Sequence, residues 1–273
     1  MPDKTQKVGI YVDVSNINMN GGFGMRYDVL RQFACRQGGV ATRLNAYCSY
    51  DQTRADNDVS YRNGYKSFMN ALRDIGYKVN IKQVKHYTDR ETGATISKAN
   101  ADMDLAVDVL LQSDNLDYVL LVTGDGDFIN VVRAVQNKGC RVECLGFKNV
   151  SMDLKKEADS YINGYLVPDL LGAVKHKGYD NQIEWGSIGS IARGCCFNYP
   201  GGYGFLMVLC DRAGNIWNRD VRDPESPYIS IFFHENELPP DFNTSILPDR
   251  DTIFEFEIQS NEKGLIAVDI EVV

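Results

Sequence analysis

The stretch LLVTGDGDF, residues 120–128, runs from the aliphatic residues of a predicted buried strand directly into two carboxylates separated by one glycine. A second segment, VGIYVDVSN at residues 8–16, has the same form, with Asp13 immediately after an apolar run. In an open α/β sheet, ligands bind beyond the carboxyl ends of the strands, where the strand order reverses. We therefore expect these two strands to be neighbours at that reversal, so that Asp13, Asp125 and Asp127 converge.

Around these two segments, apolar β-type runs alternate with helix-type patterns. Strands are expected at 7–12, 41–50, 78–84, 118–122 and 141–147, and helices at 27–37, 61–76, 102–113, 127–139 and 151–162. The strands are apolar enough to be buried on both faces. The alternation predicts an α/β fold, a doubly wound parallel sheet with helices on each side.

The pattern changes near Pro168, where the segments become short, β-rich and separated by Gly, Pro, Asn and Asp. Such segments lie at 186–192, 202–210, 215–219, 228–238, 252–260 and 264–273. They predict a second, smaller all-β domain, a barrel or a sandwich. We place the first domain at 1–172, a linker at 173–180 and the second domain at 181–273.

The composition is that of a soluble globular protein, with 44% hydrophobic and 24% charged residues among 273. There is no apolar run long enough for a membrane span, and the first residues lack the layout of a secretion signal, so we expect a cytoplasmic protein with no membrane partner. The seven cysteines are odd in number and match no zinc or redox spacing, so neither disulfides nor a structural metal is expected.

The net charge of -8 is unevenly distributed. Residues 1–177 hold 23 Lys and Arg against 21 Asp and Glu, whereas residues 178–273 hold 6 against 16. Residues 178–273 thus carry a charge of -10 and repel polyanions at long range.

The segment KANADMDLAVDVL supplies further carboxylates. Asp102 is expected at the N-cap of a helix, and Asp104 and Asp108, four residues apart, share one helix face. From the residues alone, Asp102 is either a metal ligand or a plain cap, and Asp104 either a ligand or a solvated residue. Asn16 either orients substrate or caps a turn.

Several carboxylates in one pocket destabilise the fold unless a cation compensates them. Oxygen ligands without His or Cys suit Mg²⁺ or Mn²⁺ rather than zinc or copper. Because Mg²⁺ commonly shares its coordination shell with substrate phosphates, the acids indicate metal-assisted phosphoryl transfer or hydrolysis. None of the three histidines, His86, His176 and His234, lies near the acids in sequence, so no general base is assigned.

The motifs YVDVSNI, ADMDLAVDVL and VTGDGDF, followed by GCRVECLGF and EADSYI, resemble the NYN domain of LabA-like proteins, a branch of the PIN-like nuclease superfamily, over about residues 7–170. All the acids that this family uses are present. Three positions differ: Val14 replaces a glycine of the first motif, Ala101 a valine of the middle motif, and Thr123 a serine of the last, which keeps the hydroxyl.

The resemblance implies an endoribonuclease that depends on Mg²⁺ or Mn²⁺ and cuts single-stranded RNA. Asp13, Asp102, Asp125 and Asp127 would hold the metal, Asp108 would assist, and Asn16 and Thr123 would contact substrate. Basic residues expected to hold the RNA backbone beside this pocket are Lys98, Lys148, Lys155 and Lys156, although such residues are often only solvated.

The second domain resembles a cold-shock domain, a small OB-type barrel, in its segments GGYGFLMV and SIFFHENEL. Period-two alternation puts Tyr203 and Phe205 on one face, and Phe232 and His234 likewise, as a platform on which unpaired bases would stack. Two positions depart from the family pattern: Gly202 stands where a lysine is expected, and Cys196 where a tryptophan is expected. RNA binding, contacts with a protein partner and packing on the first domain are alternative roles.

Two other functions are considered for the whole chain. A metal-dependent binding module of the von Willebrand A type would need Asp-x-Ser-x-Ser after the first strand, but Ile17 occupies the last place. A catalytically silent RNA-binding or scaffold role is compatible with the family. The sequence leaves open whether the chain forms a homodimer and which RNA it cuts.

Overall fold

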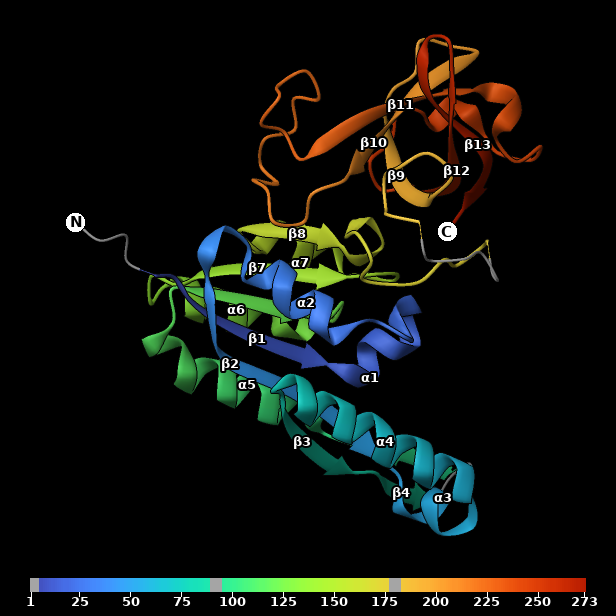
Figure 1. Cartoon of the computed structure of the whole chain (residues 1–273). Helices are drawn as coiled ribbons and strands as arrows, with labels where there is room; N and C mark the ends of the chain where they lie inside the picture. The colour runs from blue at the N-terminus through green and yellow to red at the C-terminus, as the bar shows by residue number, and fades with distance from the viewer. Residues whose placement is uncertain (1–4, 89–94, 177–182) are drawn as a thin grey trace. The chain divides into compact units, whose positions relative to one another are not determined.

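The computed structural model describes residues 5–88, 95–176 and 183–273, which form two compact units (Figure 1). Residues up to 23 and residues 38–162 belong to the first unit, and residues 24–37 and 163–273 belong to the second. The helix α2 (Tyr27–Ala34) is thereby part of the second unit. The predicted linker at 173–180 lies partly outside the described residues, and the domain boundaries drawn from the sequence stay a prediction.

The first unit is built on a six-stranded sheet with the order β3-β2-β1-β6-β7-β8. Its strands are β1 (Lys7–Asp13), β2 (Val40–Tyr50), β3 (Lys78–Gln83), β6 (Tyr118–Val122), β7 (Arg141–Gly146) and β8 (Ser160–Asn163). From the central pair β1 and β6, successive strands are added outward on both sides, so the strand order reverses between these two. They pair in parallel, with Val12 opposite Val122. The predicted doubly wound parallel sheet, with its reversal at this pair, is confirmed.

Helices cover both faces of this sheet, because the strand residues are apolar on both sides. The helices of the first unit are α1 (Val14–Ile17), α3 (Gln52–Asn57), α4 (Val59–Ile75), α5 (Ala101–Gln112), α6 (Ile129–Gln136) and α7 (Met152–Glu157). The helices α5, α6 and α7 share one core with alternate residues of β6, Val119 and Leu121. In Figure 1, α4 lies on the side of the sheet that faces the viewer and α6 on the opposite side.

Strand β6 shows how burial follows from this layering. All five of its residues, YVLLV, are buried, although neighbouring side chains point to opposite faces. A strand covered on both sides has no polar face, so it reads as a continuous apolar run. Asp125 follows two residues after Thr123, at the first point where the chain leaves the buried layer.

The helix predicted for 151–162 is too long. The structure ends α7 at Glu157 and places the strand β8 at Ser160–Asn163. The physical reason lies at Asp159: its carboxylate accepts the N–H of Val142 at 2.7 Å, and its own N–H donates to the carbonyl of Val142 at 2.9 Å. This pairing with β7 outweighs the local helix preference and starts a further strand.

Other sequence expectations need smaller corrections. The helix α3 and the hairpin of β4 (Lys85–Thr88) and β5 (Thr95–Lys98) were not anticipated. In the second unit, residues 186–190 and 215–219 form turns instead of strands. Gly186 and Gly189 have φ values of 87° and 86°, a left-handed conformation that favours turns over strands.

The second unit contains a closed barrel with the order β10-β11-β13-β12-β9. Its strands are β9 (Ile191–Asn198), β10 (Tyr203–Leu209), β11 (Tyr228–His234), β12 (Phe254–Asn261) and β13 (Gly264–Val272). Strands β11 and β13 pair in parallel and the other pairs are antiparallel. The expected small all-β barrel is confirmed as a five-stranded barrel of mixed pairing. Its core includes Leu206, Phe233 and Phe256.

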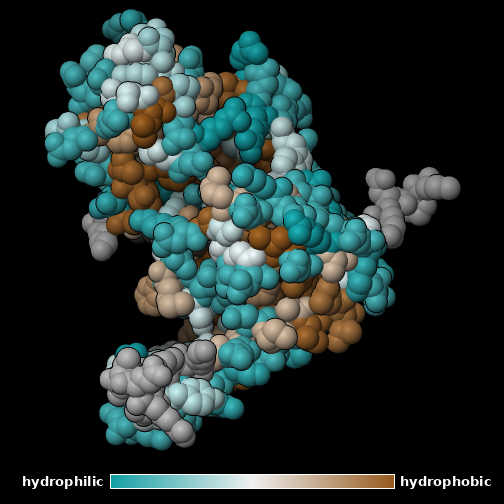
Figure 2. Space-filling model, turned by 180° about the vertical axis from the view of Figure 1, so that it is seen from behind, coloured by the Kyte–Doolittle hydropathy of each residue, from teal (hydrophilic) through white to brown (hydrophobic). Residues whose placement is uncertain are grey.

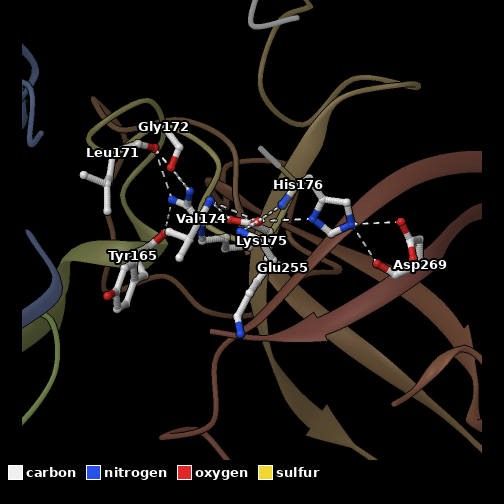
Figure 3. Close-up of polar contacts among 9 residues, drawn as sticks. Tyr165, Leu171, Gly172, Val174, Lys175, His176, Glu255 and Asp269 are labelled. Atoms are coloured by element: carbon white, nitrogen blue, oxygen red, sulfur yellow. Dashed lines mark hydrogen bonds and ion pairs between the residues drawn. The ribbon is translucent and has the colours of Figure 1, made fainter. Parts of the chain in front are cut away.

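A buried ion pair fastens the segment before the barrel to its strands (Figure 3). Arg193 on β9 and Glu255 on β12 are 1% and 0% exposed, and Arg193 Nε lies 2.7 Å from Glu255 Oε2. The Arg193 guanidinium donates to the carbonyls of Tyr165 and Leu171 at 3.2–3.3 Å, and also to that of Gly172.

The carboxylate of Glu255 completes this arrangement from the other side. It accepts the backbone N–H groups of Val174 and His176 at 2.8 and 3.0 Å. Burial raises the pKa of Glu255, but these N–H donors and the Arg193 charge outweigh it and lower the pKa to about 2. His176 in turn contacts Asp269 Oδ2 at 3.1 Å. The chain from Tyr165 to His176 is thereby fixed to the barrel wall.

Across the described ranges of the chain, no helix combines the length and the apolar character that a bilayer crossing requires.

Candidate functional site

Asp13 stands at the last position of β1 and begins the turn that leads into α1. Its carboxylate Oδ1 accepts the backbone N–H of Asn16 at 3.0 Å, which caps the short helix. The side chain is only 4% exposed. A carboxylate is therefore held by the backbone in an almost buried position at the carboxyl edge of the sheet.

Asn16 joins the two strand ends that the sequence predicted to meet. Its side-chain Oδ1 accepts the backbone N–H of Gly124 at 2.8 Å. Gly124 follows β6 and is closely packed, since an added Cβ would lie 3.3 Å from the Cα of Val150. Of the two roles considered for Asn16, the structure shows a hydrogen bond that fixes the turn after β6 beside the turn after β1.

The turn after β6 presents Asp125 and Asp127. Asp125 Oδ1 accepts the N–H of Asp127 at 2.9 Å and so begins a short 3₁₀ turn, Gly126–Phe128. Phe128 is 2% exposed and anchors this turn in the core, whereas Asp127 is exposed. The turn thus directs the Phe128 ring into the core and leaves the carboxylates of Asp125 and Asp127 nearer the surface.

Thr123 lies between the carboxylates and is fully buried. Its hydroxyl donates to Asp13 Oδ2 at 3.5 Å and accepts the N–H of Asp125 at 3.2 Å. The structure thus places Thr123 as a link between two carboxylate-bearing residues, and its predicted contact with substrate stays a prediction.

Asp102 comes from a third element, the first turn of α5. The helix is capped by Asn100, without a side-chain hydrogen bond, so the expected N-cap position of Asp102 is wrong by two residues. Asp102 is exposed. Burial and the charges of Asp125 and Asp127 raise its pKa.

Asp13 experiences the same crowding more strongly because it is buried. Burial, the largest cause, and the charges of Asp102 and Asp125 together raise its pKa to about 6, against the hydrogen bonds from Asn16 and Thr123. The charged side chains that act most on Asp13 are therefore both acidic. Like charges in a poorly solvated place favour a bound cation.

Asp108 is directed away from this group. Its Oδ2 accepts the hydroxyl of Tyr47 on β2 at 2.7 Å, and Asp104 Oδ2 lies 2.7 Å from Lys82 Nζ on β3. The predicted common face of Asp104 and Asp108 is confirmed, and it faces the neighbouring strands. The charges of Asp102 and Asp125 act on Asp13, and those of Asp125 and Asp127 act on Asp102, whereas Asp108 is engaged by Tyr47. That the first four hold a metal stays a prediction.

The donor set at the carboxyl edge is made of oxygens only, which fits Mg²⁺ or Mn²⁺. Among the residues that the structure describes, no three His, Cys, Asp or Glu side chains come close enough to form a complete metal site. Mg²⁺ usually keeps several waters and binds through one or two carboxylates together with substrate phosphates. The residues present fit an ion held in that way.

The predicted basic residues lie at three places. Lys98 ends β5, where it is opposite Lys85 in the register. Lys148 follows β7 and is exposed, and its backbone N–H donates to the carbonyl of Asn20 at 2.9 Å. Lys155 Nζ lies 4.7 Å from the ring centre of Tyr161, and Lys156 is exposed on α7. None of these observations tests a contact with RNA.

In the barrel, the predicted aromatic residues do share one face. The register puts Tyr203 opposite His234 and Phe205 opposite Phe232. The rings of Tyr203 and Phe232 are stacked at 5.7 Å, and Phe205 meets Phe232 edge to face at 5.8 Å. Tyr203 is 41% exposed. Phe197, which the sequence did not single out, extends the group at 6.4 Å from Phe205.

One supporting residue of the first unit was also missed. The loop after β7 closes on the turn after β6: the N–H of Ser151 donates to the carbonyl of Gly124 at 2.9 Å. An added Cβ at Gly126 would lie 2.8 Å from Ser151 Oγ. The signal in the sequence was the position of Ser151 before MDL, where its hydroxyl caps α7.

The parallel sheet that reverses between β1 and β6, with carboxylates at their carboxyl ends, defines a protein of the PIN-like class. The chain belongs to the NYN domain family, whose model matches residues 7–170. That family is a branch of the PIN-like nuclease superfamily.

Two similar proteins each match 60% of the chain. The low amplitude and bright protein LabA of Synechococcus elongatus is 25% identical over 169 residues, which is 60% of this chain and 86% of that protein. A crystal structure of a protein of unknown function from Vibrio parahaemolyticus is 25% identical, with a TM-score of 0.47, and the match covers 60% of this chain and 95% of that one.

Proposed function

We propose that the protein is an endoribonuclease that depends on Mg²⁺ or Mn²⁺ and hydrolyses phosphodiester bonds in single-stranded RNA. The observation that supports this proposal is that Asp13, nearly buried at the carboxyl end of β1, lies within the electrostatic influence of Asp102 and Asp125, which come from two other elements. Membership of the NYN family, a nuclease-like branch, supports the class of reaction.

Asp13, Asp102, Asp125 and Asp127 would hold the ion, with Asp13 as the buried anchor and the others nearer the solvent. The ion would lower the pKa of a coordinated water and neutralise charge on the phosphate oxygens. The chain itself keeps the carboxylates in place: the Asn16 side chain fixes the turn after β6, and the Thr123 hydroxyl joins Asp13 to Asp125. Asp108 would assist from a distance, through its hydrogen bond with Tyr47.

The barrel would add affinity for the unpaired bases of the same RNA. Tyr203, Phe205 and Phe232 offer a half-exposed aromatic surface, and stacking contributes about 1–3 kcal/mol per base in such sites. Since the second domain is strongly acidic, binding there would depend on stacking more than on phosphate contacts. A protein partner for this domain is the alternative use of the same surface.

Cleavage of a labelled single-stranded RNA tests the enzyme assignment. Purified full-length protein is incubated with Mn²⁺, with Mn²⁺ and excess chelator, and as the Asp125→Asn variant with Mn²⁺. We expect cleavage in the first tube only. Equal cleavage in all three would mean a contaminating nuclease or a different active site.

A catalytically silent RNA-binding role is the second candidate. It is favoured by one observation, that no complete group of three metal-ligating side chains is assembled among the described residues. RNA binding without cleavage at any Mn²⁺ or Mg²⁺ concentration would select this role over the enzyme.

A further inference from the structure

An aromatic stack lies at the carboxyl end of β2, at the same edge of the sheet as Asp13. Strand β2 is longer than its neighbour: Asp13 is the last residue of β1 and pairs with Tyr47, and β2 continues to Tyr50. At about 3.3 Å per residue, Tyr50 lies about 10 Å farther along, the length of roughly three stacked bases. The hydroxyls of Ser15 and Ser49, 3.0 Å apart, join this extension to the turn that follows Asp13.

Three tyrosines build the stack from β2 and α4. The ring of Tyr50 lies 4.8 Å from that of Tyr65 and 6.0 Å from that of Tyr61, the second pair being nearly parallel at 15°. The Tyr65 hydroxyl donates to the carbonyl of Ser49 at 3.0 Å, and the Tyr61 hydroxyl accepts the N–H of Asp51 at 3.2 Å. All three rings are only half-buried, although they are held in fixed positions.

Arg54 from α3 ends the stack on the solvent side. Its guanidinium carbon lies 4.4 Å from the ring centre of Tyr61. The Arg54 side chain is 61% exposed, and its contact with Asp58 is long, at 3.7 Å. A planar guanidinium that lies over an aromatic ring and is open to solvent is a group on which an unpaired base stacks.

The residues that carry the stack, 50–66, hold three Lys and Arg against three Asp and Glu, and the basic excess comes from the residues that follow them. Residues 50–98 hold nine Lys and Arg against six Asp and Glu, within a chain of net charge -8. Arg62 and Lys66, each one position after a tyrosine of the stack, are exposed on α4. Figure 1 shows α3, the start of α4 and β4 together beyond the carboxyl end of β3, and in Figure 2 the coloured residues at this end of the first unit are mostly hydrophilic.

We propose that Tyr50, Tyr61 and Arg54 form a base-stacking subsite for single-stranded RNA, which holds the strand beside the carboxylates of the first unit. The assignment deepens the proposed function and rests on it for the identity of the ligand. The rings offer π-faces to bases of any sequence, and the basic side chains around them attract the phosphate backbone. Such a subsite lies in the nuclease-like unit itself and is separate from the aromatic face of the barrel.

The test measures binding without cleavage. A fluorescein-labelled oligouridylate is titrated with full-length protein in excess chelator, so that no divalent ion is available. We expect the Kd to rise about tenfold for Tyr61→Leu and for Arg54→Gln, in line with the loss of one stacked base. Arg133→Gln is the matched control, because Arg133 is similarly exposed, at 57%, and lies in the last turn of α6.

A change in Kd that is no larger for Arg54→Gln than for Arg133→Gln overturns the subsite. Melting temperatures close to that of the wild type show that the variants are folded. Crosslinking of RNA that contains 4-thiouridine to the wild-type protein gives a second result that needs no variant. Crosslinked peptides from residues 50–66 support the subsite, and crosslinks confined to the barrel overturn it. Failure of the nuclease proposal is seen separately, as absence of cleavage with Mn²⁺.

Discussion

The side-chain Oδ1 of Asn16 accepts the backbone N–H of Gly124 at 2.8 Å, and this contact joins the turn after β1 to the turn after β6. Each turn carries carboxylates, Asp13 in one and Asp125 in the other. Their separation is therefore set by a side chain that is itself uncharged. An amide is suited to this position because it accepts a hydrogen bond without adding a further negative charge to the group.

Asn16→Leu should impair both folding and catalysis. The substitution leaves the buried N–H of Gly124 without its acceptor, at a cost of about 1–3 kcal/mol in the free energy of unfolding. A displacement of the turn by about 1 Å would lower the rate of Mn²⁺-dependent RNA cleavage about a hundredfold. Both quantities are measured against Asn137→Ala, an exposed position after α6, where no change is expected. Wild-type cleavage by Asn16→Leu would show that the bridge does not position the carboxylates.

Asp125→Asn and Asp108→Asn should differ in their effect on cleavage, because we expect Asp125 to bind the metal and Asp108 to accept only a hydrogen bond from Tyr47. Asp125 stands in the convergent group, so its replacement should lower cleavage at least about a hundredfold and weaken Mn²⁺ binding in calorimetry. Asp108 accepts the Tyr47 hydroxyl, and an asparagine oxygen accepts it as well, so Asp108→Asn should keep cleavage within about tenfold of the wild type. Equal losses in the two variants would place Asp108 at the metal.

The adjacency of β1 and β6 could be predicted because buried strands of a parallel sheet appear in the sequence as continuous apolar runs. An apolar run such as YVLLV that ends in acids marks both the strand and its carboxyl end. The contributions of Asp102 and Asp108 were harder to separate. Six residues of α-helix turn by about 600° and advance about 9 Å, so the two carboxylates cannot serve one site from the same face. The sequence motif contains both aspartates. Only the way α5 packs on the sheet determines which of them lies toward Asp125.

The aromatic stack on β2 could not be predicted, because it depends on the distance between elements. Tyr50, Tyr61 and Tyr65 are common residues at unremarkable spacings until α4 is packed beside the end of β2. The error at β8 has a similar cause: the residues of 151–162 favour a helix locally, and the pairing of Asp159 with Val142 redirects the chain. Tertiary contacts decided both outcomes.

Glu255→Gln should destabilise the second unit, and acid should do the same to the wild type. Removing one charge of a buried pair leaves Arg193 unpaired, at a cost of about 3–5 kcal/mol. Because the pKa of Glu255 is lowered to about 2 in the folded state, its contribution to stability is present above the ordinary carboxyl pKa of about 4.5 and is lost as the pH falls toward 2.

Tryptophan fluorescence in urea measures this effect selectively, since the protein has two tryptophans, Trp185 and Trp217, and both lie in the second unit. The difference between wild type and Glu255→Gln should be large at pH 7 and should shrink as the pH approaches 3. Glu271→Gln, an exposed position on β13, serves as the control. A difference that stays constant with pH would mean that the carboxylate charge contributes nothing to stability.

Substitution of the aromatic face of the barrel should weaken RNA binding with little dependence on salt. Phe232→Leu removes a ring that contacts both Tyr203 and Phe205, and should cost about 1–3 kcal/mol of binding free energy for single-stranded RNA. Trp217→Leu is the matched control for Tyr203→Leu, because the two side chains are exposed to nearly the same extent, 42% and 41%. Since residues 178–273, which include the barrel, carry a charge of -10, the loss caused by Phe232→Leu should be similar at low and high salt. The losses caused by Arg54→Gln should shrink as salt rises, because that contact is charged. If Phe232→Leu and Tyr203→Leu bind RNA as tightly as Trp217→Leu does, the aromatic face does not bind RNA, and contact with a protein partner is its alternative role.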